Sequence, residues 1–267
     1  MHRALPCYIG LMCLLLMAPI VIVVVLAFSG AGYLRFPPTS FSLRWFTRFL
    51  GDPQWQAALW YSLIIGVIAC VVATVVGFFA AYALVRASFA AKKLLLSLLL
   101  LPIIVPTVIT SIAMYFLAAR LHLVGNLLWI GICHAVIALP VVILILLATL
   151  QGVDVNLERA ALSLGASRLR LFTHVVVPLA APGIVSAALF AFLASFDELI
   201  ISLFLTGVRA QTLPVRIWNS LHMEIEPTIA AVSAFLIGVT ALVLLADHLL
   251  RGRRTATLNT QRQEPGR

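Results

Sequence analysis

Six long apolar runs constrain this chain more than any other feature of its sequence. Each run has about 20 residues or more, the length that a helix needs to cross ~30 Å of hydrocarbon. The runs are residues 8–28, 57–85, 94–119, 127–150, 179–205 and 228–250. Because backbone polar groups in lipid must be paired within the spanning segment, we expect each run to be an α-helix. The sequence therefore predicts an all-α, polytopic membrane helical bundle with six transmembrane helices.

Composition and charge exclude other classes of protein. Apolar residues make up 63% of the chain and charged residues 10%, whereas a soluble domain has ~45–50% and ~25%. The net charge of +9 does not indicate nucleic-acid binding, because the 18 lysines and arginines lie in the short gaps between apolar runs. The four cysteines lie inside apolar runs without metal-ligand spacing. We therefore expect no bound metal and no bound cofactor.

The distribution of basic residues predicts that both termini are cytoplasmic. With that orientation the cytoplasmic segments hold 12 lysines and arginines and the external segments hold 6, as the positive-inside rule requires. The first apolar run exceeds the ~7–15 residues of a signal-peptide core, so we expect it to remain a span. Trp45 and Trp55 are expected at the membrane interface. We expect residues 1–250 to form the transmembrane domain and residues 251–267 to form a disordered, basic cytoplasmic tail.

The predicted cytoplasmic segment 151–177 has the local pattern of two short helices. Asp154 or Asn156 can cap a first helix, and Gly165 can end it in the left-handed conformation. The residues at helical spacing on one face of it are Leu157, Ala160, Ala161 and Leu164. The second short helix carries Leu169 and Phe172 on one side, with Arg168 and Arg170 beside them. Pro178 is expected to break the chain before the fifth span.

This segment resembles the signature loop of the integral-membrane permeases of ATP-binding-cassette importers. In that family the loop has Glu-Ala-Ala, three residues, Gly, nine residues and then Ile-x-Leu-Pro. The present chain has Arg159-Ala160-Ala161, three residues, Gly165, nine residues and then Val175-Val176-Val177-Pro178. Two positions depart from the pattern, because Arg159 stands at the glutamate position and Val177 replaces leucine. If the family glutamate makes a charge contact, either Glu158 supplies it here or the contact is absent.

The resemblance implies a type I importer permease fold in a bacterial inner membrane. It implies that the loop docks in a groove on a separate ATP-binding subunit, present in two copies, which uses ATP and Mg. A second permease subunit and a periplasmic solute-binding protein are the other partners that it implies. The motif indicates a set of coupling residues, which are Glu158, Arg159, Ala160, Ala161, Gly165 and Pro178.

More narrowly, residues 5–250 resemble the second permease subunit of spermidine/putrescine-type importers. The stretches that carry this resemblance are Phe196-Asp197-Glu198-Leu199 and Thr212-Leu213-Pro214-Val215-Arg216-Ile217-Trp218. The resemblance implies a small cationic solute, a polyamine such as putrescine or spermidine. Permeases for opines, thiamine, ferric iron and phosphonates belong to the same group, so these solutes stay open as alternatives.

Two acidic residues, Asp197 and Glu198, lie within the fifth apolar run toward its external end. Acids inside a membrane usually face a water-filled cavity or a partner charge. One hypothesis is that one or both line the pathway of a cationic solute, together with the aromatic side chain of Trp218. The alternative hypothesis is a structural pair that caps a broken helix or bridges to Arg209 or Arg216.

Sequence motifs of an enzyme are missing. No G-x-x-x-x-G-K-[ST] is present, since the only lysines are Lys92 and Lys93 and neither follows a glycine. There is also no H-E-x-x-H and no G-x-S-x-G, and no catalytic residue is predicted. His134 is expected to be a hydrogen-bonded structural histidine rather than a proton relay. The sequence therefore predicts a non-enzymatic subunit that depends on a separate ATPase; a secondary transporter is the weaker alternative, because no repeated halves are visible.

Overall fold

The protein is α-helical in the parts that the structure describes. The computed structural model describes residues 4–207, 210–223 and 227–242. In these ranges the only β-pairing is one isolated bridge between Ser29 and Phe41. The predicted tail 251–267, the end of the sixth apolar run and Arg209 lie outside the described residues.

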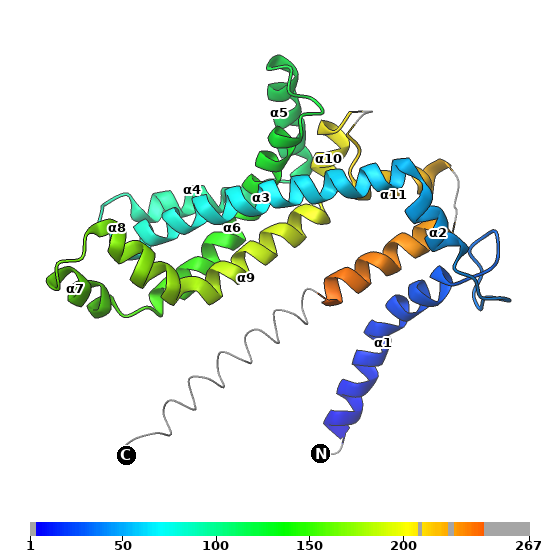
Figure 1. Cartoon of the computed structure of the whole chain (residues 1–267), viewed down its shortest axis with the longest axis horizontal. Coiled ribbons are helices and arrows are strands. Elements are labelled where there is room, and N and C mark those ends of the chain that lie inside the picture. Colours follow the sequence, from blue (N-terminus) through cyan, green and yellow to red (C-terminus); the bar gives the residue numbers. More distant parts are fainter. Residues whose placement is uncertain (1–3, 208–209, 224–226, 243–267) are drawn as a thin grey trace. The chain divides into compact units, whose positions relative to one another are not determined.

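The chain divides into two compact units, Ala57–Arg216 and the pair of end segments Met1–Gln56 and Ile217–Arg267. The first unit contains α3 (Pro53–Arg86) from Ala57 onward, α4 (Lys92–Ile104), α5 (Thr107–Arg120), α6 (Leu127–Gln151), α7 (Val155–Ser163), α8 (Arg168–Leu171), the π-helical turn η1 (Phe172–Val176), α9 (Val177–Phe196) and α10 (Ile200–Leu205) (Figure 1). The second unit, which is formed by the two end segments of the chain, contains α1 (Ala4–Ala27), α2 (Arg44–Gly51) and a helix at Thr228–Leu242. By sequence, α11 (Leu213–Met223) begins in the first unit and ends in the second.

In the second unit, α2 packs against the end of α1 and the helix Thr228–Leu242. Trp45 of α2 is buried with Ala27 and Ala231, and the ring of Phe49 lies 5.4 Å from that of Phe235. Trp45 and Trp55 are only 6% and 4% exposed. Both tryptophans are therefore part of this unit's core, and their expected position at the membrane interface stays a prediction.

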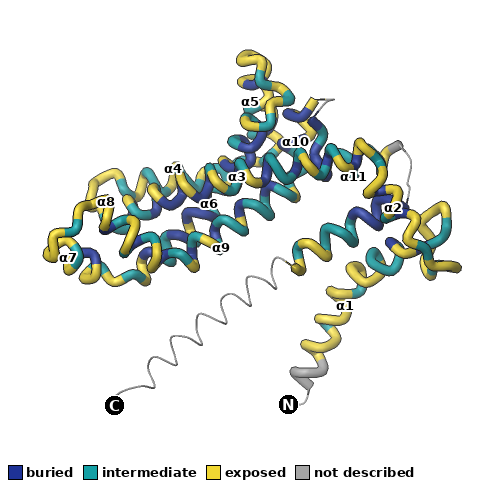
Figure 2. Tube along the Cα trace, viewed as in Figure 1, coloured by how far each residue is buried: buried dark blue, intermediate teal, exposed yellow. Residues whose placement is uncertain are grey.

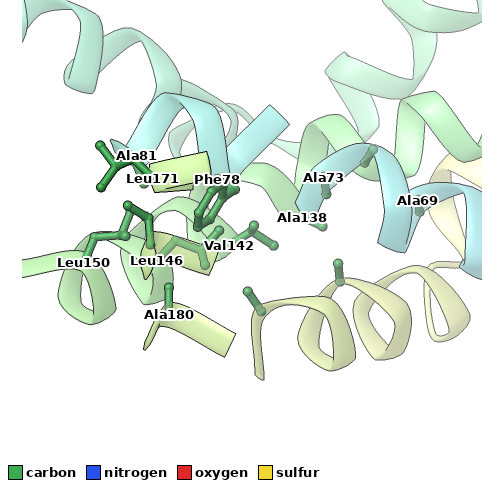
Figure 3. Packing of buried hydrophobic residues seen from close by; sticks show 14 residues of the cluster. Ala69, Ala73, Phe78, Ala81, Ala138, Val142, Leu146, Leu150, Leu171 and Ala180 are labelled. Atoms are coloured by element: carbon green, nitrogen blue, oxygen red, sulfur yellow. The ribbon is translucent and has the colours of Figure 1, made fainter. Parts of the chain in front are cut away.

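The core of the unit Ala57–Arg216 is made largely of small side chains. It combines Ala69, Ala73 and Ala81 of α3, Ala138 of α6, and Ala180, Ala187 and Ala191 of α9 (Figure 3). Small residues let helix backbones approach closely, which is the main source of helix–helix attraction in lipid. At Gly183 of α9 the approach is closest, because an added Cβ would lie 2.6 Å from the Thr149 Cβ of α6.

In the described part of the chain, four helices are long and apolar enough to span a membrane, and the bent pair α4 and α5 could make a fifth span. The four helices are Tyr8–Ala27, Pro53–Arg86, Leu127–Gln151 and Arg168–Phe196. The first three lie on predicted runs within a few residues, whereas the last begins and ends about ten residues before the predicted run 179–205. The apolar helix Thr228–Leu242 lies on the first part of the run 228–250, and the rest of that run is outside the described residues.

The predicted run 94–119 is not one straight helix. Its two parts, α4 and α5, are bent by 99° relative to each other. Val105 is extended with ψ 128°, and Pro106 precedes α5. A residue before proline is driven into the extended region, and proline cannot continue the α4 hydrogen-bond ladder. The bend therefore follows directly from the Val105–Pro106 pair.

Candidate functional site: segment 151–177 and the break after α9

Segment 151–177 contains the two short helices that the sequence predicts. At the start of α7 the Asp154 carboxylate accepts a 2.8 Å hydrogen bond from the backbone N–H of Asn156, so Asp154 is the cap. Gly165 ends the helix with a φ of +84°. Its N–H and that of the next residue donate to carbonyls of the last helical turn at 3.0 and 3.1 Å, which is a Schellman motif. The predicted glycine turn is confirmed.

Pro178 does not break the chain, and that expectation is wrong. From Arg168 to Phe196 the chain is one continuous helix of 29 residues. Just before the proline, the N–H of Val177 donates to the carbonyl of Phe172 across a π-helical turn. Proline is tolerated in the first turn after such an irregularity, because no donor is required there. The second half of the loop is therefore continuous with the fifth apolar run.

Glu158 is buried against α3 rather than exposed on the loop. It is 6% exposed. Its Oε1 accepts from Nε and Nη2 of Arg86 at 2.8 and 2.7 Å, and its Oε2 accepts from the Tyr82 hydroxyl at 3.1 Å. Arg86 Nη2 also donates to the carbonyl of Val153 at 2.9 Å. Glu158 thus ties α7 to the end of α3, and its carboxylate is not available to another protein.

An aromatic cluster also attaches the loop to the end of α3. The ring of Phe172, in the π-helical turn, lies parallel to that of Phe79 at 5.6 Å between centroids. It meets Phe78 and Tyr82 edge-on at 5.4 and 5.2 Å. Both halves of the loop are therefore fixed to α3, α7 through an ion pair and η1 through aromatic packing.

The other side of the loop is exposed. Arg159 and Ala160 of α7 are exposed, and Leu164 in the glycine turn is 89% exposed. Figure 2 shows α7 at the end of its unit with mostly exposed residues. Ala161 instead packs against the alanine-rich core, so the predicted apolar face is split between core and surface. The exposed part can contact another protein.

At the opposite end of α9 the two acidic residues have different environments. The Glu198 carboxylate accepts from the backbone N–H groups of Ile200 and Ile201 at 2.9 and 3.1 Å. Glu198 therefore caps α10, as the structural alternative for this pair predicted. Asp197 follows the last residue of α9 and is exposed. Its carboxylate has no hydrogen bond or ion pair among the described residues.

His134 connects both sides of this break. It is 2% exposed. Its Nδ1 lies 2.8 Å from the Ser195 hydroxyl on α9, and its Nε2 lies 3.2 Å from the Ser202 hydroxyl on α10. The prediction of a hydrogen-bonded histidine is confirmed. The bonds hold α9 and α10 at a fixed separation on α6.

Trp218 and Asp197 belong to different units, so the predicted grouping of these residues stays a hypothesis. Trp218 is 42% exposed, and its ring lies 4.4 Å from that of His222 on the same helix. Sequence reasoning missed Arg86, Tyr82 and the two serines that bind His134. Only Arg86 carried a usable signal, as a basic residue directly after an apolar run.

Comparison with known proteins agrees with this architecture. A sequence profile of the family described as "Binding-protein-dependent transport system inner membrane component" matches residues 73–255. The putrescine transport system permease protein PotI of Escherichia coli K12 is 29% identical over 94% of this chain and 92% of its own length. The spermidine/putrescine permease protein PotC of Haemophilus influenzae is 30% identical over 87% and 91%. The trehalose transport system permease protein SugB of Mycobacterium tuberculosis is 33% identical over 79% and 78%.

The fold also matches solved transporters. A chain of a bacterial ABC transporter involved in alginate import superposes with a TM-score of 0.72 at 15% identity, over 94% of this chain and 95% of that one. A chain of an amino acid ABC transporter gives a TM-score of 0.56 at 20% identity, over 79% and 98%. This chain therefore belongs to the family of binding-protein-dependent transport system inner-membrane components, the non-catalytic permease subunits of ATP-binding-cassette importers.

Proposed function

We propose that this permease forms half of the translocation pathway for a small cationic solute, a polyamine such as putrescine or spermidine. The observation that carries the proposal is Asp197, an exposed carboxylate with no partner among the described residues, at a break in an apolar helix. A carboxylate in that place favours an ammonium group. Relatives named for putrescine and spermidine transport support the polyamine class.

In this proposal the chain has six spans with both termini cytoplasmic, and residues 151–177 face the cytoplasm. It works with a second permease, two ATP-binding subunits and a periplasmic solute-binding protein. ATP and Mg bind only to the ATP-binding subunits. Residues 1–250 form the membrane domain, and 251–267 form a cytoplasmic tail. Positive-inside counting supports this orientation.

Coupling of ATP hydrolysis to transport would run through α7 into α3. Docking of an ATP-binding subunit on Arg159, Ala160 and the turn at Gly165 would move α7. The Arg86–Glu158 ion pair at 2.7 Å and the aromatic contacts of Phe172 would pass that movement to the membrane helices. Packed helices respond to such forces by shifting as units.

The test is ATP hydrolysis by the complete importer in vesicles, with the solute-binding protein and a panel of solutes. Stimulation by putrescine or spermidine is expected, and Asp197→Asn is expected to reduce uptake about tenfold or more without loss of assembly, since one charge contact to an ammonium is removed. Stimulation by trehalose instead of polyamines would replace the polyamine proposal with a sugar, in line with the trehalose relative.

A further inference from the structure

We propose that the exposed face of α7 and α8 binds a groove lined with carboxylates, and that the ATP-binding subunit of this importer carries an acidic residue opposite Arg159. The inference rests on the function proposed above and adds the chemistry of the partner surface. The exposed surface of this segment, called here the basic docking face, is not one side of a single helix; its exposed residues are Leu157, Arg159, Leu164, Arg168, Leu169 and Arg170.

The basic docking face is positively charged because the two acidic residues of the loop already have partners within the chain. The loop has two carboxylates, Asp154 and Glu158. Glu158 is 6% exposed and is paired with Arg86 at 2.7 Å. Asp154 is exposed, but it caps α7 at the end away from the glycine turn. In the described part of the chain, the three guanidinium groups of the face pair with no carboxylate.

The apolar part of the face indicates a protein partner. Leu164 is 89% exposed and Leu169 is 73% exposed, on either side of the turn between α7 and α8. Exposed leucines flanked by arginines have the composition of a protein–protein contact, in which arginine is enriched and an apolar centre is surrounded by charge. The partner groove should therefore combine an apolar floor with carboxylates at its rim.

The position of Arg159 determines which charge we expect on the partner protein. In the signature loop that the sequence resembles, this position holds glutamate. Glu158 cannot take over that contact, because its carboxylate points to Arg86 and Tyr82. Arg159 is thus the charged side chain that α7 presents outward, and the complementary charge on the ATP-binding subunit must be negative.

The first experiment is cross-linking in the assembled importer. Arg159→Lys is purified with its own ATP-binding subunits and treated with a carbodiimide, which joins an amine to a carboxylate that touches it. Wild-type protein is the matched background, since its only lysines are Lys92 and Lys93 and arginine does not react. We expect an added covalent product between the variant and the ATP-binding subunit, linked through an aspartate or glutamate of the latter.

The second experiment is charge reversal. Arg159→Glu restores the residue of the family motif, yet it should lower retention of the ATP-binding subunit on the tagged permease by about tenfold or more, because attraction becomes repulsion. Arg159→Gln should fall between it and the wild type. Full retention with Arg159→Glu, together with no cross-link from Arg159→Lys, would refute the charge inference and leave docking intact. If wild-type permease retains no ATP-binding subunit at all, the proposed function fails as well.

Discussion

Replacing Arg86 with methionine tests whether α7 is held to the membrane helices by its ion pair. The change removes both bonds to the Glu158 carboxylate, at 2.7 and 2.8 Å, and the 2.9 Å bond to the Val153 carbonyl. It leaves a buried carboxylate with the Tyr82 hydroxyl as its one partner. Removing one member of a buried pair costs about 3–5 kcal/mol.

The structure favours the lower end of that range. The Arg86 side chain is 17% exposed and that of Glu158 is 8% exposed, so water can reach part of the site once the guanidinium is gone. A cost of about 3 kcal/mol corresponds to roughly a 100-fold rise in the population in which α7 is detached, at about 1.4 kcal/mol per factor of ten. The cost is local, because the core of α3, α6 and α9 is unchanged.

Hydrogen exchange of the α7 amides in the purified complex measures this opening. Arg86→Met should speed exchange in Val155–Ser163 by up to about 100-fold, while exchange in α6 stays the same. Arg86→Lys should give a smaller change, because lysine keeps the charge but not the two-pronged geometry. The double variant Arg86→Met/Glu158→Met should recover much of the loss, since no unpaired charge remains.

Arg120→Met is the control, because it removes an exposed guanidinium outside segment 151–177 and should leave exchange of the α7 amides nearly unchanged. Equal exchange in Arg86→Met and wild type would refute the reasoning, because Arg86 would then contribute nothing to holding α7. Failure of the double variant to recover would show that Arg86 acts through packing rather than charge.

Three further predictions concern the turn at Gly165, the hydrogen bonds of His134 and the contact of Gly183 with Thr149. Gly165→Ala should destabilise the α7–α8 turn by about 1–2 kcal/mol, because φ is +84° and alanine disfavours that region; local exchange at the turn checks it, and equal exchange in both proteins would contradict it. His134→Leu should lower the thermal stability of the complex, since the Ser195 and Ser202 hydroxyls lose a buried partner at about 1–3 kcal/mol each; an unchanged melting temperature would count against the bridge. Gly183→Ala should cost about 1–3 kcal/mol through overpacking on Thr149, and Thr149→Ala in the same chain should relieve the loss in a denaturation assay.

Local chemistry in the sequence predicted the elements that depend on it. The apolar runs required helices, since no water is present in a bilayer to pair backbone groups. The cap at Asp154 and the turn at Gly165 need only neighbours within a few residues, so both were predictable. The spacing from Arg159-Ala160-Ala161 to Pro178 is also a feature of the sequence alone, and it indicated the family before the fold was known.

Contacts between residues that are far apart in the chain could not be predicted from the sequence. His134 meets Ser195 and Ser202 across 61 and 68 positions of the chain, and no local pattern connects them. The bend between α4 and α5 shows an intermediate case, because Pro106 suggested an interruption but not its angle.

The sequence by itself determined that this chain is a helical membrane permease with two short helices in segment 151–177. It could not assign roles within the pairs Glu158–Arg159 and Asp197–Glu198, because neighbouring residues of a helix point about 100° apart and the break between α9 and α10 that holds the second pair was expected under only one of two hypotheses. Only the tertiary structure decided, by placing Arg86 and Tyr82 beside Glu158 and the free N–H groups of α10 beside Glu198. A carboxylate removed from water needs such partners, and the neighbour in each pair, Arg159 or Asp197, is exposed.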